Sequence, residues 1–192
     1  RSLCDWSSDV CSSDLINGFS YFWEIASTGM KKQHLGFELI IYDDENELPA
    51  FEKRLLDKAI KARKSAYAPY SNFQVGAAVL MENGEVVIGN NQENASYPSG
   101  LCAERVAVFQ AGALYPGVGM LAIAVSAASN NHLVDVPAGP CGNCRQAIFE
   151  YEVKQKSPIS VLLQGEKGPV FKCGSISDIL PLAFGNSFLG DS

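Results

Sequence analysis

Four apolar runs along the chain predict buried strands. The first covers residues 73–80, and Asn83-Gly84 follows it as the turn of a hairpin whose second strand covers residues 85–89. The other three runs predict strands at residues 120–127, 159–163 and 170–173. Earlier in the chain, Phe37, Leu39 and Ile41 recur at every second position, which predicts one more short strand, and the acidic residues 43–47 after it predict a solvated turn.

Helical spacing predicts three longer helices and one short one. Pro49 fits the first turn of a helix, where its missing N–H costs nothing, and this helix would bury a stripe formed by Phe51, Leu55, Leu56, Ala59, Ile60 and Arg63. Two further helices begin near Cys102 and Cys141, and residues 177–181 suggest a last short helix. Because strands alternate with helices after an opening hairpin, the pattern predicts an α/β domain on a mixed sheet.

The chain divides by pattern into three segments. Residues 49–192 form the predicted domain and residues 30–48 an N-terminal extension, whereas residues 1–29 have neither helical nor strand periodicity. Met30, followed by two lysines, would make a natural initiator, and residues 11–15 can be back-translated into a common sequencing-adapter sequence. We interpret residues 1–29 as a gene-assembly artefact or a misassigned start, and the alternative is a genuine but poorly structured extension.

Composition and charge narrow the possible partners. The net charge is −6 and no basic run stands out, which argues against a nucleic-acid partner. No apolar stretch is long enough to predict a membrane span. A Cys-x-x-Cys pair in a chain without a convincing signal peptide indicates a reducing compartment, so we expect a cytoplasmic protein.

Three cysteines and one glutamate lie at the two predicted helix starts. Glu104 follows Cys102 by two residues, and Cys141 and Cys144 form the Cys-x-x-Cys pair directly after Pro140. Thiolates suit Zn²⁺, and a catalytic zinc takes three protein ligands and keeps a fourth position open. Glu104 is close enough in sequence to handle the proton of a bound water without being a ligand itself. Since helix starts also favour thiolate over thiol, the motif predicts a catalytic zinc site.

The alternative to this interpretation is a structural zinc closed by a fourth ligand. Cys173 or His132 could supply it, although Cys173 is otherwise expected to be a buried apolar residue and His132 a surface one. Glu104 and the paired helix starts favour the catalytic site. Three thiolates on one zinc leave a formal charge of −1, and Arg105 or Arg145, both next to ligands in sequence, could hydrogen-bond a thiolate and withdraw that charge.

The motif pattern resembles that of zinc-dependent nucleobase deaminases. From about Pro49 to Gly185 the chain is similar to cytidine deaminases of the compact, homotetrameric type. The blocks that match are residues 67–71, 73–78, 91–95, 102–105, 140–146 and 180–184. It departs from that family in residues 1–29, in the added segment 31–48 and in Asn143 at a variable motif position.

The resemblance implies a three-layer α/β fold, in which helices cover both faces of a mixed β-sheet. It also implies the reaction that the protein catalyses. That reaction is hydrolytic deamination of the small-molecule nucleosides cytidine and deoxycytidine to uridine and deoxyuridine with release of ammonia, in pyrimidine salvage. It further implies Zn²⁺ held by Cys102, Cys141 and Cys144, with Glu104 transferring protons. The implied substrate residues are Asn91 and Glu93 for the ribose, Phe73 against the base, Ala103 in the substrate site, and Phe184 contributed to a neighbouring subunit of a homotetramer with shared active sites.

The residues alone leave alternatives open. Asn91 and Glu93 suit a sugar because an amide both donates and accepts and a carboxylate accepts, but they also fit an ordinary polar turn. Phe73 equally fits a plain core aromatic, and the segment around Phe184 could pack on its own subunit. For the function, the alternatives are a deaminase of a cytosine-containing antibiotic nucleoside and a non-catalytic zinc-stabilised domain.

Overall fold

The computed structural model describes residues 30–190 of the chain. Residues 1–29, and with them the interpretation of that segment as an artefact, lie outside the described residues. From Gly36 onward the described residues form one compact unit, which does not include residues 30–35. The compact unit therefore begins inside the segment 30–48, which was predicted to be one N-terminal extension.

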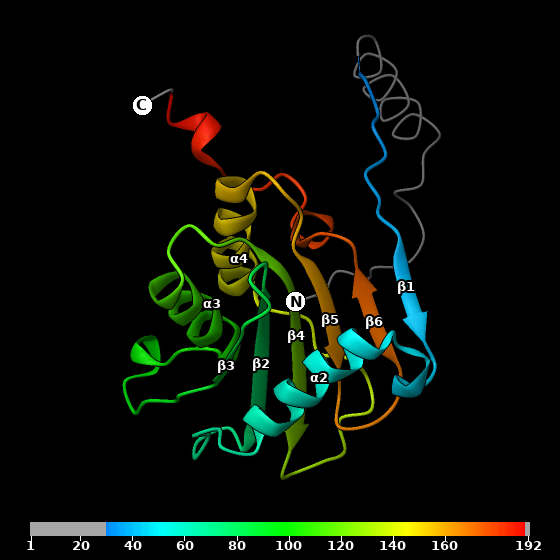
Figure 1. The fold of residues 1–192 in the computed structure, drawn as a ribbon, viewed down its shortest axis with the longest axis vertical. Coiled ribbons are helices and arrows are strands. Elements are labelled where there is room, and N and C mark those ends of the chain that lie inside the picture. Colours follow the sequence, from blue (N-terminus) through cyan, green and yellow to red (C-terminus); the bar gives the residue numbers. More distant parts are fainter. Residues whose placement is uncertain (1–29, 191–192) are drawn as a thin grey trace, which may run out of the picture. The chain divides into compact units, whose positions relative to one another are not determined.

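Six strands form one mixed sheet in this unit (Figure 1). In sequence they are β1 (Leu39–Tyr42), β2 (Phe73–Met81), β3 (Val86–Asn90), β4 (Met120–Ser129), β5 (Ser160–Gln164) and β6 (Val170–Cys173). Their order across the sheet is β1-β6-β5-β4-β2-β3. β4 and β5 pair in parallel, and every other neighbouring pair is antiparallel. The expected mixed sheet is confirmed.

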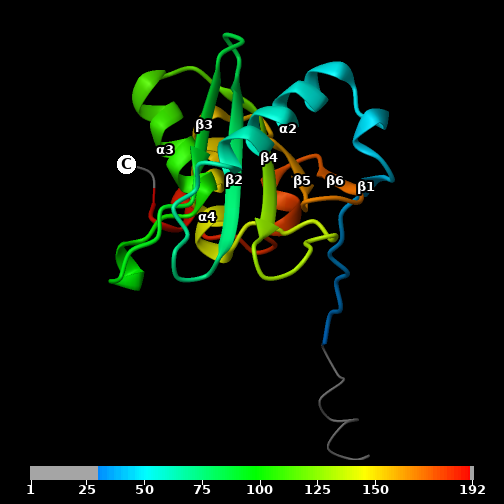
Figure 2. The same ribbon diagram turned by 90° about the horizontal axis from the view of Figure 1, so that it is seen from below.

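Helices cover both faces of the sheet. They are α2 (Ala50–Arg63), α3 (Ala103–Leu114) and α4 (Gly142–Gln155). Successive strand residues face opposite sides, so Ala78 packs in the core beneath α2, whereas Ala77 and Val79 pack in the core with α3 and α4. Figures 1 and 2 show the three helices around the sheet from two directions. The three-layer α/β arrangement with helices on both faces is confirmed.

Two glycines allow the helices to approach the sheet closely. A Cβ on Gly76 in β2 would lie 2.1 Å from the carbonyl oxygen of Ala59 in α2, and one on Gly89 in β3 would lie 2.6 Å from the carbonyl oxygen of Ala103 in α3. Both distances are too short for any side chain. Gly89 thereby brings the start of α3, where the first predicted metal ligand is located, directly onto the sheet.

Several short elements differ from the sequence-based expectation. The acidic turn contains a 3₁₀ helix (Glu45–Glu47). The last helix, expected at residues 177–181, is a 3₁₀ helix that begins one residue earlier and ends two residues earlier (Ile176–Ile179). Two further 3₁₀ helices form at Tyr97–Ser99 and Asn186–Phe188. A single turn has too few residues for helical spacing to define it, which is why the pattern missed or shifted these elements.

The stripe of α2 that was expected to be buried differs from that expectation at its two ends. Phe51, expected in the stripe, is 49% exposed, whereas Arg63 is buried as expected but through polar contacts. Its Nη1 donates to Ser126 Oγ at 2.8 Å and to the carbonyl oxygen of Ala127 at 3.0 Å. Burial lowers the pKa of Arg63, and the charge of Glu166 opposes this effect. The hydrogen bonds offset part of the free-energy cost of burying the guanidinium.

β1 is the edge strand that the N-terminal extension adds. It pairs with β6 from Leu39 opposite Cys173 to Tyr42 opposite Val170. Ile40 and Ile41 remain exposed, so this strand covers the edge of β6 without contributing much to the core. Among the described helices, none is both long and apolar enough to cross a membrane.

Candidate metal centre and substrate pocket

The three predicted metal ligands meet where two helices begin. Cys102 is the N-cap of α3, Cys141 is the N-cap of α4, and Cys144 lies in the first turn of α4. The two helix starts adjoin because α3 and α4 pack against each other on one face of the sheet. Neither N-cap side chain makes a capping hydrogen bond to the backbone of its helix, so both sulfurs remain available as ligands.

The spacing of the sulfurs fits one zinc ion. The three Sγ atoms all lie within 4.8 Å of one another, with 3.9 Å between Cys102 and Cys141 and 3.4 Å between Cys141 and Cys144. A tetrahedral zinc with ordinary zinc–sulfur bonds places two thiolates about 3.8 Å apart. Small shifts of the side chains would therefore suffice for the three cysteines to hold Zn²⁺.

A closed structural site does not form with either residue considered for it. Cys173 lies in the core of the sheet at 1% exposure, as expected for a small apolar residue. His132 is exposed, and neither residue joins the group of close ligand atoms in the part of the chain that the structure describes. Three protein ligands with an open fourth position are the arrangement of a catalytic zinc.

The cysteines share their protons unequally. A hydrogen bond with Cys144, and then one with Arg105, lowers the pKa of Cys102 to about 5. The same bond with Cys102 raises the pKa of Cys144. The Cys102 thiolate thus accepts a hydrogen bond from the Cys144 thiol. A bound cation would displace the proton of that thiol, because cysteine binds metals as the thiolate.

Glu104 lies beside the sulfurs and away from water. It is in the first turn of α3 and is 5% exposed. Burial raises its pKa, and the charge of Cys102 adds to that effect. A carboxyl group whose pKa moves towards neutrality accepts and returns protons more readily at the pH of the cell.

The two arginines next to the ligands have different contacts. Burial opposes the charge on Arg105, but its hydrogen bond and its attraction to Cys102 raise the pKa of its guanidinium overall. Arg105 thus lies close enough for its charge to act on Cys102, as charge tuning requires. Arg145 instead donates to two backbone carbonyls, those of Pro140 at 2.7 Å and Ile179 at 2.8 Å. The expectation that Arg145 bonds a thiolate finds no corresponding contact.

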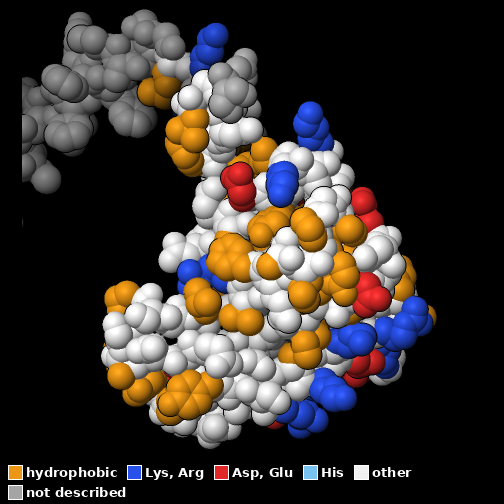
Figure 3. Space-filling view, turned by 60° about the vertical axis from the view of Figure 1, so that its left-hand side comes forward, with side chains coloured by type: hydrophobic (Ala, Val, Ile, Leu, Met, Phe, Trp, Pro, Cys, Tyr) orange, Lys and Arg blue, Asp and Glu red, His pale blue; other side chains and the backbone are white. Residues whose placement is uncertain are grey.

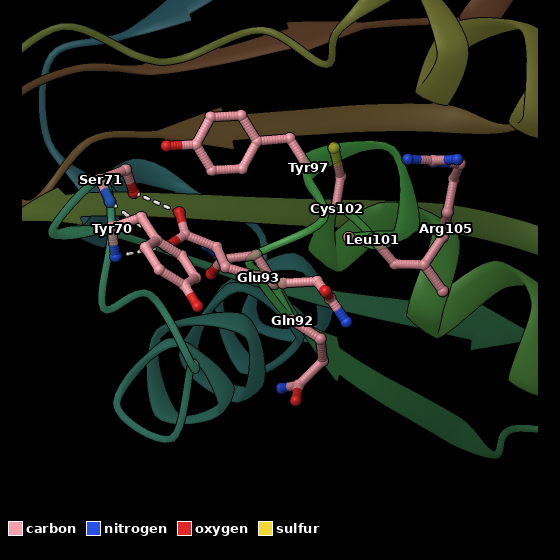
Figure 4. A pocket seen from close by; sticks show the side chains of 11 residues that line it. Tyr70, Ser71, Gln92, Glu93, Tyr97, Leu101, Cys102 and Arg105 are labelled. Carbon is pink, nitrogen blue, oxygen red and sulfur yellow. Dashed lines mark hydrogen bonds between the residues drawn. The ribbon is translucent and has the colours of Figure 1, made fainter.

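A cavity of about 510 Å³ opens beside Cys102 (Figure 4). Its volume is in the range of small-molecule sites. Tyr70 and Tyr97 form an edge-to-face pair at one side, with ring centroids 6.0 Å apart. The lining residues are Tyr70, Ser71, Asn91, Gln92, Glu93, Asn94, Tyr97, Gly100, Leu101, Cys102 and Arg105. One metal ligand and both predicted ribose residues thus border the same space.

Glu93 points across this cavity to the turn formed by Tyr70 and Ser71 (Figure 4). Its Oε2 accepts from the backbone N–H groups of Tyr70 at 2.9 Å and Ser71 at 3.2 Å, and its Oε1 accepts from the Ser71 hydroxyl. The Ser71 hydroxyl, followed by these backbone bonds, lowers the pKa of Glu93 below its ordinary value. A carboxylate has about four acceptor sites, so one remains for a sugar hydroxyl.

Asn91 has a structural role that the sequence did not indicate. Its Oδ1 accepts from the N–H of Val75 at 2.8 Å, and its Nδ2 donates to the carbonyl of Phe73 at 2.9 Å. One N–H and one lone pair of the amide remain for a ligand. Phe73 itself is half-buried and does not line the cavity.

Two further predicted substrate residues lie outside the cavity. Ala103 is completely buried in the core under α3. Residues 180–190 form the C-terminal tail. In this tail Phe184 is 57% exposed and stacks on Phe188 with ring centroids 5.6 Å apart. No residue of the tail lines the cavity of its own subunit. The contribution of Phe184 to a neighbouring subunit's site stays a prediction.

Sequence reasoning missed Tyr97 as a pocket residue. It is 76% exposed, in the 3₁₀ helix that leads to the first metal ligand. The only signal for it was an aromatic residue next to Pro98 in a loop just before Cys102, which is too weak to assign a function. The edge-to-face pair with Tyr70 shows that it belongs to the rim.

The comparisons with known proteins agree with this geometry. Residues 49–157 match the family model of the cytidine and deoxycytidylate deaminase zinc-binding region. The chain is 42% identical over 130 residues to a cytidine deaminase of Halalkalibacterium halodurans, which covers 68% of this chain and 91% of that protein. It is 37% identical over 131 residues to a cytidine deaminase of Mycobacterium tuberculosis, covering 68% of this chain and 87% of that protein.

Solved structures show the same likeness. A crystal structure of cytidine deaminase from Burkholderia pseudomallei superimposes with a TM-score of 0.61 at 42% identity, covering 71% of this chain and all of that one. The crystal structure from Mycobacterium tuberculosis gives a TM-score of 0.54 at 33% identity, over 72% of this chain and 99% of the other. The relatives are matched over nearly their whole length.

Proposed function

The chain belongs to the cytidine and deoxycytidylate deaminase family, and we propose that it hydrolyses cytidine and deoxycytidine to uridine and deoxyuridine with release of ammonia. One observation supports this proposal most strongly. Cys102, Cys141 and Cys144 form a three-sulfur group with Glu104 buried beside it, and Cys102 borders a nucleoside-sized cavity. The alternative of a non-catalytic zinc domain does not explain a buried carboxyl group next to an open ligand position.

The bound Zn²⁺ would supply an activated water for attack on the ring carbon that bears the amino group. Glu104 takes a proton from that water and delivers it to the adjacent ring nitrogen. It then takes the remaining proton from the hydroxyl group now bonded to that carbon and transfers it to the amino group, which leaves as ammonia while the carbonyl of the uracil ring forms. One carboxyl group thus serves every transfer. The burial of Glu104 excludes bulk water from these steps.

The other side of the cavity would bind the sugar. Glu93 has one acceptor site left after its three bonds to Tyr70 and Ser71, and Asn91 has one N–H and one lone pair left. Both are held by the fold before a ligand arrives. A site built in this way favours a nucleoside over the free base, because the free base cannot use these groups.

An ultraviolet deamination assay on cytidine, deoxycytidine, cytosine and cytidine monophosphate tests the proposal. We expect turnover of both nucleosides and little of free cytosine. We also expect little of the monophosphate, because Glu93 repels its phosphate. Glu104→Gln protein with full zinc content is the control for contaminating activity. Absence of nucleoside turnover by zinc-loaded protein would contradict the proposal.

We also propose a homotetramer in which Phe184 completes the substrate site of a neighbouring subunit. The support is the exposure of the tail, where Leu182 is 92% and Leu189 74% exposed, together with Phe109 and Leu114 on α3. Figure 3, which brings the side of α3 and α4 forward, shows hydrophobic side chains distributed over this face. Surfaces of this kind usually have a partner.

We place the reaction in pyrimidine salvage in the cytoplasm. The support for salvage is the proposed nucleoside substrate. The support for the compartment is the chemistry of the cysteines, because the four in the described part of the chain are free. A site of three thiolates needs a reducing compartment.

A further inference from the structure

Arg145 joins two parts of the protein that lie far apart in sequence. Its Nε donates to the carbonyl of Pro140 at 2.7 Å, and its Nη1 donates to the carbonyl of Ile179 at 2.8 Å. Pro140 directly precedes the ligand Cys141, and Ile179 is the last residue of the 3₁₀ helix from which the C-terminal tail emerges. One planar guanidinium thus bridges the ligand loop and the base of the tail.

Arg145 lies on α4, and α4 contacts the C-terminal segment at two further points, one in the tail and one at the 3₁₀ helix that precedes it. Gln146 donates through Nε2 to the carbonyl of Phe184 at 2.9 Å. Glu152, which is 8% exposed, accepts from the Ser175 hydroxyl at 2.7 Å and from the N–H of Ile176 at 3.2 Å. α4 therefore contains a metal ligand at its first turn and, further along, the residues that attach the tail. Of these residues, Arg145 alone contacts the ligand loop as well.

The position of Arg145 beside the ligand loop is fixed by packing. A Cβ built on Gly139 would lie 3.4 Å from its Nη2, so the guanidinium lies against the loop that leads to Cys141. The sulfurs have Arg105 as their charged neighbour. The contacts of Arg145 are with carbonyl oxygens only, among the hydrogen bonds of the described residues.

We propose that Arg145 is a positioning residue that fixes the Pro140–Cys141 turn and the base of the tail relative to each other. The placement of one metal ligand and that of Phe184 then depend on the same side chain. Its effect on catalysis rests on the proposed function and assembly, whereas its effects on metal retention and on the tail do not. The arginine fork is required, because a single ammonium cannot reproduce two donors at fixed separation.

Arg145→Lys and Arg145→Gln test the proposal. The lysine keeps the positive charge but loses the bridge, so both variants should release zinc to an excess of chelator about 10- to 100-fold faster than wild type. Hydrogen exchange should also accelerate at the backbone amides of residues 180–189 in both. Gln146→Leu is the matched control, because it loses only the tail contact: it should accelerate tail exchange and leave zinc release unchanged.

Each outcome distinguishes the bridge from the alternatives. If the lysine variant keeps both wild-type rates while the glutamine variant does not, Arg145 acts through its charge and the proposal is wrong. Faster exchange throughout β4 would indicate general destabilisation, which also contradicts it. If Arg145→Gln does not fold, the lysine variant decides alone. Zinc release and tail exchange that change as expected in a protein without deaminase activity would support the bridge and refute the proposed function.

Discussion

The metal centre and the C-terminal tail represent two opposite ways of building a site. The metal centre is complete within one chain: Cys144 and Glu104 are buried, and the three sulfurs already have the spacing that zinc requires. The tail is fixed at its base, yet it leaves Leu182 and Phe184 exposed. The difference teaches that the chemical step is preorganised within the subunit, whereas in the proposed homotetramer the enclosure of the substrate would depend on assembly. The side of the cavity proposed for the ribose is intermediate, since it is preformed but open.

The largest effect should come from the metal centre. Glu104→Gln keeps the shape of the side chain and removes the proton carrier, and general acid–base catalysis contributes about 10²–10⁴-fold. Because this one group serves several proton transfers, we expect a kcat loss at or beyond the upper end of that range. Zinc content and melting temperature should remain near wild type. Glu150→Gln, an exposed position on α4, is the control, and retention of a tenth of wild-type activity in Glu104→Gln would contradict the role.

The ribose side should show a smaller, selective effect. Glu93→Ala removes a charged acceptor, and a hydrogen bond to a charged group is worth about 1.5–3 kcal/mol, or roughly 10- to 150-fold in kcat/KM for cytidine. Free cytosine, if it is processed at all, should be indifferent to the change. Equal losses on cytosine and cytidine would mean that Glu93 acts only by holding the Tyr70–Ser71 turn.

The tail should affect binding without affecting the metal. Phe184→Ala should raise KM for cytidine about tenfold, which is the order expected for an aromatic side chain that is buried only in the assembly. Zinc content should not change. Leu189→Ala, also exposed on the tail, should leave KM near wild type.

A mixing experiment makes the test of the tail sharper. In a hybrid of Phe184→Ala and Glu104→Gln subunits, an intact Glu104 can receive an intact Phe184 from a neighbour. The mixture should therefore regain part of the low-KM activity. An active monomer that shows no recovery on mixing would refute the shared site.

The smallest effect concerns the support of Glu93. Its pKa is lowered first by the Ser71 hydroxyl, so Ser71→Ala should raise that pKa. The ionised carboxylate is the form of Glu93 that accepts the hydrogen bond of the sugar. With a raised pKa it becomes protonated at a higher pH, so cytidine binding should weaken earlier in the variant than in wild type as the pH falls. At neutral pH, where Glu93 stays ionised, we expect KM to rise only about threefold, because the lost bond orients Glu93 and does not itself bind the substrate. An unchanged acid limb in the profile of 1/KM against pH would contradict the coupling.

Local pattern was sufficient to predict most elements and the metal ligands. The strands β5 and β6 begin and end within one residue of the predicted runs, and Cys102 and Cys141 begin helices as expected. Burial of alternating residues and helix starts are properties of neighbouring residues, so the sequence records them directly. The three-residue spacing of Cys141 and Cys144 likewise defines a local geometry.

Long-range contacts could not be predicted in the same way. Nothing in the order of residues indicates that β1 pairs with β6, because pairing depends on the whole fold. Arg145 is even closer in sequence to a ligand than Arg105 is, yet it is Arg105 whose charge acts on Cys102, while Arg145 donates to backbone carbonyls. A long flexible side chain can reach many partners, and which one it finds depends on the surrounding backbone. The polar contacts of Asn91 and Glu152 were missed for the same reason.

The pairing of β1 with β6 has a consequence for synthesis on the ribosome. Leu39 pairs with Cys173 and Tyr42 with Val170, so an early apolar segment depends on residues translated far later. At about 5–20 residues per second, the partner strand follows roughly 7–25 seconds behind. During that interval the nascent chain exposes an unpaired strand of leucine, isoleucine and tyrosine, which is a binding motif for chaperones and a hazard for aggregation between neighbouring nascent chains. Slower translation between these segments would lengthen that exposure, so the yield of folded protein should depend on codon usage between them.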